Sequence, residues 1–493
     1  MAVISKSSYI RGIKCHKALF LHFNQPEVRN EINDQQQSLF DTGHEVGKYA
    51  QQLFAGGMDA SEGNPLDRYT AVKNTQELIK AGQEVIYEAA FSDGENMCYM
   101  DILVRRDGNW HAYEVKASTE VKDYHRDDVA FQYYVITRSG LPLASINLMH
   151  INNKYVRRGE LDLTQLFASE DLTDESILKQ EQVGLNLLLL RNMLAAGIEP
   201  VVEPGAQCTN PYACDFCGYC NRDKQWYPLS DLKGINPAKA LELHNLGVKS
   251  FDDIPEDFHF TDKEWDLAHA EFEQKEVRND EALAAFTGRL DYPLYYMDFE
   301  TIMPAVPMYD ENRPYQQIPF QYSLHIQETP DSEVRHYEWL GTPPTDPRPE
   351  FADTLIKLLG THGSIVTYNM AFECSRLKEI ARDFPQYSAA ISNLLPRIVD
   401  LMAPFRSRHL YRPAMKGSYS IKAVLPAYIN DISYHDLEIQ EGGTASLTYL
   451  SIYQDTDIEI MRIKRENLLK YCKLDTLAMV KLMGLVESHF SLI

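Results

Sequence analysis

Two strand-like stretches on either side of a tight turn constrain the fold of the first half of this chain more than any other feature. Residues 100–106 and 110–117 are rich in apolar side chains, and the turn between them is built on Asp107-Gly108-Asn109. Such a turn between two apolar runs is typical of a β-hairpin. The sequence therefore predicts two paired strands here.

Three charged side chains of this hairpin are expected to meet at one end of the sheet. Asp101 opens the first strand, and Glu114 and Lys116 close the second, where their spacing of two places them on one face. Two carboxylates can hold a divalent cation, and an ammonium beside them can orient a water or offset the charge of a phosphate. The pattern indicates a hydrolytic site for phosphodiesters, and an exposed hairpin with ordinary surface charges is the alternative.

Two predicted helices add polar side chains. Residues 41–47 open an amphipathic helix that carries His44, and Gln132 follows Asp128 by one helical turn. With these motifs the chain resembles the RecB-like branch of the PD-(D/E)xK nucleases, which have a restriction-endonuclease-like core. The resemblance implies Mg²⁺ or Mn²⁺ ligands at His44, Asp101 and Glu114, with Lys116 and Gln132 as catalytic residues.

Five cysteines suggest a second kind of metal centre. Four of them crowd into residues 208–220, and Cys15 stands far upstream. Crowded thiols in a chain without a secretory signal are more typical of metal ligands than of disulfides, and their spacing suits zinc as well as an iron–sulfur cluster. The other three, Cys98, Cys374 and Cys472, have apolar neighbours and are expected to be buried structural thiols.

A further resemblance favours an iron–sulfur cluster over zinc at the cysteines. Iron–sulfur nucleases of the AddB and CRISPR-adaptation type pair one N-terminal cysteine with three that follow the nuclease core. The resemblance implies a 4Fe-4S cluster bound by Cys15, Cys208, Cys214 and Cys220. Cys217 is then a spare thiol, although the run Cys214-x2-Cys217-x2-Cys220 would also close a site.

Composition narrows the class of protein. A length of 493 residues suggests about three domains, and 44% apolar with 24% charged residues is ordinary for a globular chain. No apolar run could cross a bilayer and residues 1–23 lack a signal-peptide core, so we expect a cytoplasmic protein without a membrane partner. The net charge of −23 argues against coating nucleic acid by bulk electrostatics.

Basic residues are nevertheless concentrated in two acid-free segments, 1–26 and 401–430. In the second segment they alternate with aromatic residues, which suits either a path for a nucleic acid strand or a solvated face. Residues 160–200 are predicted to be mostly helical. Residues 229–240 predict a helix, a glycine turn and a second helix capped by Asn236, which could hold a backbone phosphate as in helix-hairpin-helix modules or form a plain linker.

A second chemical centre begins at residues 295–301, a predicted buried strand with Asp298 and Glu300 on one face. Two carboxylates so placed repel each other unless a cation lies between them. Further strands are predicted at 319–325, 336–340, 364–368 and 398–401, with helices from Phe351 and around Tyr471 and Asp475. Strands followed by alternating helices and strands predict an RNase H-like mixed sheet.

This half resembles the DEDDy class of 3′–5′ exonucleases. Asp298 and Glu300 match its DxE motif, Tyr471 and Asp475 match its Y-x3-D motif, and residues 420–425 resemble its SLK helix. The second motif differs, because Glu373 stands where the family has Asp, and Asp400 resembles a supporting Asp. The resemblance implies two divalent ions held by Asp298, Glu300, Glu373 and Asp475, with Tyr471 positioning a water.

Together the two resemblances predict an α/β (α+β) multidomain protein, similar to uncharacterised bacterial proteins that fuse two nucleases. Its expected parts are a RecB-like domain at 1–225, a helical linker at 226–289 and an RNase H-like domain at 290–493. The expected activity is end-directed degradation of DNA in repair, recombination or defence. The alternatives are a 3′–5′ exoribonuclease that processes RNA, and a nucleic-acid-binding iron–sulfur scaffold with one or both sites inactive.

Overall fold

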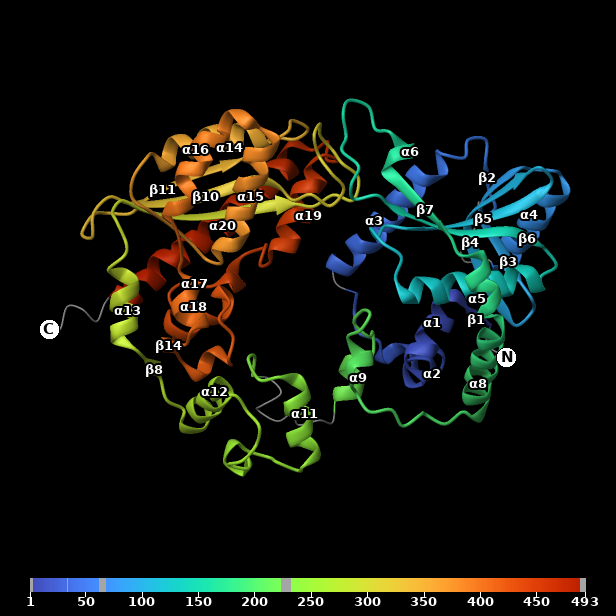
Figure 1. Cartoon of the computed structure of the whole chain (residues 1–493), viewed down its shortest axis with the longest axis horizontal. Coiled ribbons are helices and arrows are strands. Elements are labelled where there is room, and N and C mark those ends of the chain that lie inside the picture. Colours follow the sequence, from blue (N-terminus) through green and yellow to red (C-terminus); the bar gives the residue numbers. More distant parts are fainter. Residues whose placement is uncertain (1–2, 33, 62–67, 223–231, 488–493) are drawn as a thin grey trace. The chain divides into compact units, whose positions relative to one another are not determined.

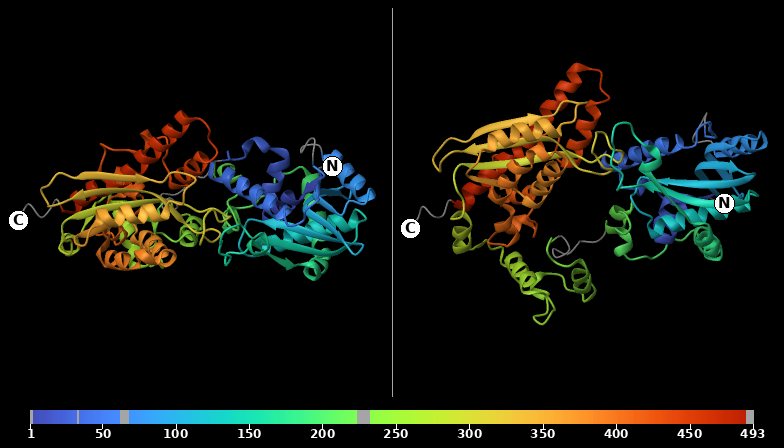
Figure 2. Two further views of the ribbon diagram at one scale, coloured as in Figure 1. Left: turned by 90° about the horizontal axis from the view of Figure 1, so that it is seen from above. Right: turned by 45° about the horizontal axis from the view of Figure 1, so that its top comes forward.

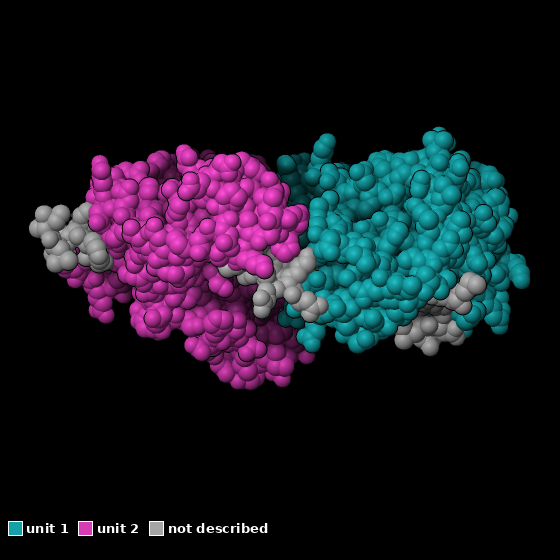
Figure 3. Space-filling view, turned by 90° about the horizontal axis from the view of Figure 1, so that it is seen from below, with its two compact units in different colours: residues 1–223, 304–316 teal, residues 224–303, 317–493 magenta. Residues whose placement is uncertain are grey.

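The computed structural model describes residues 3–32, 34–61, 68–222 and 232–487, which form two compact units (Figure 1). Unit 1 comprises Met1–Asp223 with Pro304–Gln316, and unit 2 comprises Lys224–Met303 with Gln317–Ile493, as coloured in Figure 3. This division differs from the expected three parts, because residues 226–289 belong to unit 2 and residues 304–316 belong to unit 1. No helix among the described residues could span a membrane.

Unit 1 is built on a seven-stranded mixed sheet of order β2-β3-β4-β5-β6-β7, with β1 paired to β4. Its strands are β1 (Ile4–Ser5), β2 (Met58–Asp59), β3 (Val85–Ser92), β4 (Asn96–Arg106), β5 (Asn109–Lys116), β6 (Leu143–Ile151) and β7 (Phe167–Asp171). Its described α-helices are α1 (Lys6–Lys14), α2 (His16–Asn24), α3 (Asp34–Gln51), α4 (Arg68–Lys80), α5 (Asp123–Arg138), α6 (Leu163–Leu166), α7 (Thr173–Leu178), α8 (Gln180–Ala196) and α9 (Cys217–Asn221).

The predicted hairpin is confirmed as β4 and β5. Asp107 and Gly108 have φ angles of 50° and 80°, the positive values that a tight two-residue turn requires. Asp101 lies in the middle of β4 rather than at its start, because β4 begins at Asn96. The prediction of mostly helix at 160–200 missed β7, which pairs antiparallel with β6.

Helices cover both faces of this sheet (Figure 2). On one face α1, α5 and α8 bury an apolar core that includes Tyr9, Phe131 and Leu187. On the other face α3 packs through Val46 and Ala50. The hairpin is therefore enclosed, and any polar group that it turns toward α1 and α5 lies in a setting of low dielectric.

Unit 2 contains a five-stranded sheet of order β11-β10-β9-β12-β13 and a two-stranded sheet of β8 and β14. Its strands are β8 (Val277–Arg278), β9 (Leu294–Ile302), β10 (Ile318–Gln327), β11 (Arg335–Leu340), β12 (Ser364–Thr367), β13 (Ile398–Asp400) and β14 (Leu410–Tyr411). Its described α-helices are α11 (Pro237–Asn245), α12 (Asp262–Glu273), α13 (Asp280–Thr287), α14 (Arg348–Leu359), α15 (Met370–Asp383), α16 (Ser388–Leu394), α17 (Met402–Arg406), α18 (Ile421–Tyr428), α19 (Gly442–Ile452) and α20 (Ile458–Glu487).

The central strand β9 pairs antiparallel with β10 and parallel with β12. Its odd-numbered residues Tyr295, Met297 and Phe299 join the core formed with α14, α15 and α16. The even-numbered residues point to the opposite face, where α20 packs on β9 and β10. Asp298 and Glu300 therefore share the face predicted for them, and that face is turned toward α20.

Other residues of unit 2 hydrogen-bond to the backbone amides around the glycine turn of the predicted linker. Residues 229–231, in the first predicted helix, lie outside the described residues, whereas the Asn236 side chain caps α11 as expected. The Lys233 amide donates to the Lys416 carbonyl at 3.0 Å, and the Glu264 carboxylate accepts from the Asn236 amide at 3.2 Å. A carboxylate already occupies this helix N-terminus, so the turn does not present the free amides expected for a phosphate.

Candidate functional site

Unit 1 places three carboxylates on neighbouring strands: Glu88 on β3, Asp101 on β4 and Glu114 on β5. The β3–β4 register continues on both sides of Glu88 and Asp101, and Ile102 pairs with Tyr113, the residue before Glu114. Glu88 has a φ angle of 50°, an uncommon conformation for a side chain other than glycine. This local irregularity of the backbone turns the Glu88 side chain toward Asp101 and Glu114, the two acids predicted from the sequence.

The pKa values of Glu88 and Asp101 are shifted in the opposite direction from that of Glu114. Burial, followed by repulsion from neighbouring acids, raises the pKa of Glu88 to about 8 and of Asp101 to about 7. Burial also opposes ionisation of Glu114, but Lys116 and Lys6 outweigh it and hold the pKa of Glu114 well below its usual range. The site therefore contains one firmly ionised carboxylate beside two that take up protons near neutral pH.

Lys116 and Gln132 meet this ionised carboxylate as predicted. Lys116 Nζ lies 2.6 Å from Glu114 Oε1 and 2.6 Å from Asp128 Oδ2, and Gln132 Nε2 donates to Glu114 Oε2 at 2.6 Å. Asp128 had no predicted role. Its Oδ1 atom and the Gln132 amide oxygen are buried, and neither has a hydrogen-bond partner within the described part of the protein. Two acceptors are thus available beside Glu114.

Lys6 is a second ammonium that the motifs did not indicate. Its Nζ atom lies 2.6 Å from the same Glu114 Oε1 atom. The parallel pairing of β1 with β4 positions it, because Ile4 pairs with Asn96 and α1 begins two residues later. The acid-free composition of residues 1–26 was the only signal in the sequence.

His44 does not join this group. It is exposed on α3, the helix that packs on the opposite sheet face. Among the described residues, His44 forms no cluster with Asp101 and Glu114 in which the ligand atoms lie within 4.8 Å of one another. The structure places Glu88, not the predicted imidazole, near enough to Asp101 and Glu114 to repel them, although these three acids also form no cluster within 4.8 Å among the described residues.

The five clustered cysteines converge from segments far apart in sequence. Cys15 lies between α1 and α2 and packs with Cys214 around the buried Phe216 ring. All five are free thiols; burial, then the neighbouring Cys214 and Cys208, raises the pKa of Cys217 to about 11. Within the described ranges no three of these sulfur atoms lie within 4.8 Å of one another, whereas a tetrahedral zinc site needs roughly 3.8 Å.

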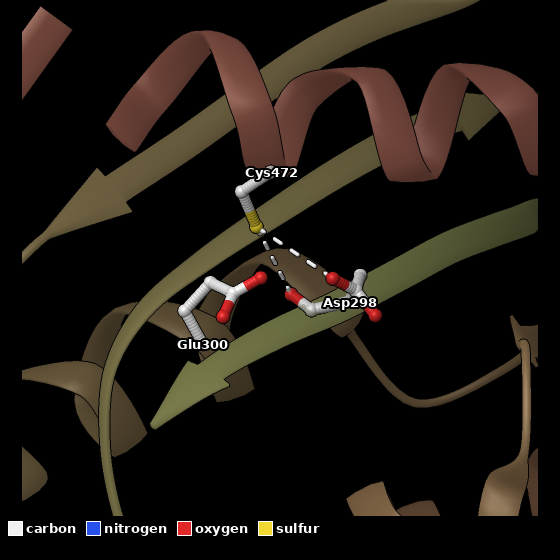
Figure 4. Close-up of side chains that lie close together, drawn as sticks. All are labelled: Asp298, Glu300 and Cys472. Carbon is white, nitrogen blue, oxygen red and sulfur yellow. Dashed lines mark hydrogen bonds between the residues drawn. The ribbon is translucent and has the colours of Figure 1, made fainter. Parts of the chain in front are cut away.

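Unit 2 gathers its predicted carboxylates around β9. Ligand atoms of Asp298, Glu300 and Cys472 all lie within 4.8 Å of one another (Figure 4). Cys472 Sγ is 3.8 Å from Asp298 Oδ2. Cys472 is buried as expected, but the prediction of apolar surroundings was wrong, because this side of α20 faces the acids.

Two tyrosines and a lysine complete the group. Tyr471 and Asp475 lie one turn apart on α20, and the Tyr434 hydroxyl donates to Asp475 Oδ1 at 2.6 Å. Lys422 Nζ lies 5.4 Å from the centre of the Tyr471 ring and 5.5 Å from that of Tyr434. Lys422 belongs to α18, the helix that resembled the SLK motif, whereas Tyr434 carried no recognisable motif.

Burial and mutual repulsion keep these acids from ionising freely. Burial, then Asp475, raises the pKa of Glu300 to about 8, and burial raises the pKa of Asp475 to about 6 although Tyr434 and Lys422 oppose the shift. For Asp298, burial and the charges of Asp475, Glu300 and Glu373 raise the pKa well above its usual value. Four like-charged groups in one buried place require protons or bound cations.

Glu373, the departure from the family pattern, is buried at 2% exposure in the first turn of α15. Burial, followed by repulsion from Asp400, raises its pKa to about 8, and its Oε2 atom has no hydrogen-bond partner among the described residues. Asp400 accepts from the Asn369 and Met402 amides, each at 3.0 Å. Asp400 thus supports the turn before α15, and Glu373 has a free oxygen.

Among the described residues, only the acidic group in unit 2 brings three possible ligand atoms within 4.8 Å of one another. Carboxylate oxygens are the ligands that Mg²⁺ and Mn²⁺ prefer, and unpartnered buried acceptors occur at Asp128 and Glu373. Cys472 adds a softer donor to the group in unit 2.

The basic side chains of residues 401–430 are largely engaged within unit 2. Arg412 pairs with Glu276 at 2.7 Å, Arg406 lies 3.5 Å from Asp400, and Arg408 donates to a backbone carbonyl. The expected strand path is therefore not a row of unpaired cations; within this segment Lys422 acts electrostatically on Glu300 and Asp475, and Arg406 lies beside Asp400.

Comparisons with known proteins cover part of the chain. Residues 295–420 match the family described as "Domain of unknown function (DUF2779)", a range that includes Asp298, Glu300 and Glu373 but ends before Tyr471. "Uncharacterized protein MG366 homolog" of Mycoplasma pneumoniae is 26% identical over 264 residues, which is 50% of this chain and 38% of that protein. "Uncharacterized protein UU173" of Ureaplasma parvum is 24% identical over 231 residues, which is 42% of this chain and 33% of that protein. The chain thus spans well under half the length of these curated relatives.

Proposed function

We propose that this chain is a metal-dependent nuclease with two active sites, one in each unit. The observation that carries the proposal is the convergence of Asp298, Glu300 and Asp475 in a buried place where each carboxyl has a raised pKa. Such a group is costly to fold unless it binds cations, and carboxylates that share divalent ions are a common means of hydrolysing phosphodiesters.

For unit 2 we propose an RNase H-like DEDDy exonuclease that trims 3′ ends. A sheet of three antiparallel strands continued by two parallel ones supports this assignment. Divalent ions supply Lewis-acid stabilisation and an activated water when bound. Asp298, Glu300, Glu373 and Asp475 would hold these ions. Tyr471 would orient the water, Tyr434 would fix the Asp475 carboxylate, and Lys422 would offset phosphate charge.

For unit 1 we propose a RecB-like PD-(D/E)xK nuclease. Asp101, Glu114 and the unpartnered oxygen of Asp128 would bind the ion, with Glu88 in the place that resemblance gave to His44. Lys116 would hold a proton and offset negative charge at the reacting phosphate, while Gln132 fixes the orientation of Glu114 through its 2.6 Å hydrogen bond.

The cysteines extend the proposal to a cofactor. Cys15, Cys208, Cys214 and Cys220 would bind a 4Fe-4S cluster that joins the N-terminal helices to the segment after α8, with Cys217 as the spare thiol. The convergence of partly buried free thiols from distant segments supports a metal centre, and zinc is the alternative occupant. We propose nucleic acid, and DNA rather than RNA, as the substrate.

A digestion panel tests the function. End-labelled single- and double-stranded DNA and RNA would be incubated with Mg²⁺, Mn²⁺ or EDTA and with wild type, Glu114→Gln, Asp298→Asn or the double variant. We expect each single variant to lose one activity and the double variant to lose both, with Glu459→Gln, an exposed carboxylate on α20, as the unaffected control. Digestion by the double variant at the wild-type rate would contradict the proposal, and cleavage of RNA alone would replace DNA as the substrate.

A further inference from the structure

A cavity of about 280 Å³ in unit 1 adjoins both the acidic group and the cysteines. Lys116 and Asp128 lie at one part of its wall, and Cys15 and Cys214 lie at another. The proposed catalytic residues and two proposed cluster ligands therefore line one partly open cavity.

One wall of this cavity is the basic face of α1. Lys6, Arg11 and Lys14 all line it, together with Ile10. Ile10 and Lys14 are one helical turn apart, and Arg11 lies beside them, so the helix presents these side chains on one side. Three basic residues of segment 1–26 thus line the same cavity, which composition alone could not show.

The charges in the cavity leave one cation without an acidic partner. Lys6 and Lys116 contact Glu114, Lys116 also contacts Asp128, and Arg11 pairs with Asp215 at 2.9 Å. For Lys14, no carboxylate of the described residues lies within 4.0 Å. Its ammonium donates to the Tyr212 carbonyl and lies 4.1 Å from the centre of the Tyr212 ring. Its ionisable neighbours include the Cys214 thiol and Asp215, and the partly desolvated ammonium can also pair with a phosphate that enters the cavity.

Aromatic rings and an unpartnered acceptor complement these cations. Tyr124 and Tyr212 both line the cavity, with ring centres 5.9 Å apart and planes at 79°. A base can stack on such a ring while its phosphate meets adjacent cations. In the metal-free protein, the buried Oδ1 atom of Asp128, which has no partner among the described residues, can accept a hydrogen bond from a base or sugar.

We propose that this cavity binds the terminal nucleotide of a nucleic acid strand, with its phosphate at Lys14 and Arg11 and its base against Tyr212. The inference rests on the proposed function of unit 1, because it names the part of the substrate that lies beside Lys116 and Asp128. It assigns to Lys14 and Tyr212 the recognition of a strand end, separately from the hydrolysis.

Binding without catalysis tests the inference. Calorimetry in EDTA would compare a thymidine dinucleotide with a 5′-phosphate, the same dinucleotide with a 3′-phosphate, the unphosphorylated dinucleotide and inorganic phosphate. The full-length Asp298→Asn variant would be used, so that the group in unit 2 contributes little. We expect one phosphorylated dinucleotide to bind tightest, which identifies the strand end. Lys14→Gln and Tyr212→Ala should each weaken it roughly tenfold or more.

Matched variants make the result specific. Lys17→Gln should bind as tightly as its parent, because Lys17 pairs with Glu199 at 2.8 Å and does not line the cavity. Lys14→Arg and Tyr212→Phe should retain most of the affinity. Iron and zinc content would be measured for each variant, and the comparison uses only variants whose content equals that of the parent.

Three outcomes would overturn the inference: equal binding by Lys14→Gln and its parent, absence of dinucleotide binding, and equal affinity for inorganic phosphate and the dinucleotides. The proposed function fails separately. Lys14-dependent binding without any cleavage that depends on Glu114 would remove the nuclease assignment and leave the nucleotide site. Cleavage that depends on Glu114, without dinucleotide binding, would support the nuclease assignment and remove the nucleotide site.

Discussion

Lys6 Nζ lies 2.6 Å from Glu114 Oε1 although the two residues are 108 positions apart in the sequence. The Glu114 side chain is only 1% exposed, so the loss of its ion pairs should be felt in stability. A double-mutant cycle of Lys6→Met and Glu114→Gln should give a coupling of about 1–3 kcal/mol in the urea unfolding of unit 1. The Lys17–Glu199 pair, with a carboxylate 29% exposed, serves as the control and should give about 0–1 kcal/mol. Equal couplings for the two pairs would contradict this prediction.

The raised pKa values predict how pH acts on the metal-free protein. Glu300 and Glu373 each have a folded pKa of about 8 against an ordinary value of 4.5, so the folded state binds more protons between these values. The free energy of unfolding should then fall as pH rises from 4.5 to 8. Burial lowers the pKa of His325 to about 3 and of His336 to about 4, which acts in the opposite direction below pH 6.5.

Thermal unfolding between pH 7 and 8 isolates the carboxylates, because these histidines are then largely neutral in both states. In EDTA the melting temperature of unit 2 should decrease over this interval, and Mn²⁺ should remove the decrease. Asp298→Asn should flatten the dependence, because it removes one of the buried carboxyls whose pKa is raised in the folded state. A melting temperature in EDTA that rises equally for wild type and Asp298→Asn would show that these acids do not carry raised pKa values.

Tyr434 and Tyr471 should affect trimming in different ways. Tyr471→Phe removes the hydroxyl proposed to orient the water, so the rate at saturating Mn²⁺ should fall by about two to four powers of ten. Tyr434→Phe removes the 2.6 Å hydrogen bond to Asp475, so Mn²⁺ affinity should fall by about tenfold to a hundredfold, with the rate recovered at high Mn²⁺. Titrating 3′-end trimming in a Glu114→Gln background measures both. Identical Mn²⁺ curves for the two variants would refute the division of roles.

The assignment of the cysteines predicts the colour of the purified protein and which cysteine variants lose iron. Protein purified without oxygen should be brown, and Cys15→Ser or Cys214→Ser should lose iron and lower the melting temperature of unit 1. Cys217→Ser should keep its iron, and so should Cys374→Ser, a control in unit 2. Colourless protein with about one zinc per chain would favour a zinc site instead. Loss of iron in Cys217→Ser would show that Cys217 is a ligand and not the spare thiol.

Local periodicity accounts for what the sequence could predict. The Asp107-Gly108 turn, the shared face of Asp298 and Glu300, and the helical turn between Tyr471 and Asp475 each depend on neighbouring residues. These signals survive in the fold because backbone geometry sets them. Cys472 could have been found in the same way, since it lies three residues before Asp475 on the same helix.

Residues that are brought to a site by contacts between segments far apart in the sequence left no local pattern from which they could be predicted. Lys6 reaches Glu114 through a two-residue strand that pairs with β4, and Glu88 is aimed by an irregularity in β3. Tyr434 reaches Asp475 from a short 3₁₀ helix, Tyr434–Asp436, 41 positions away in the sequence. An amphipathic pattern around His44 predicts a helix but cannot say which sheet face that helix covers.

Pro304–Gln316 follows directly from β9 yet belongs to unit 1, where Ala305 and Val306 join the core beneath α3 and Arg157 donates to the Pro307 and Met308 carbonyls at 3.0 Å. The polypeptide therefore passes from one unit to the other three times, after Asp223, after Met303 and after Gln316. Cutting the chain at any one of these crossings therefore divides at least one unit between the two fragments. A fragment that stops near residue 225 would lose part of its own hydrophobic core, so no single cut separates the two units with both of them complete.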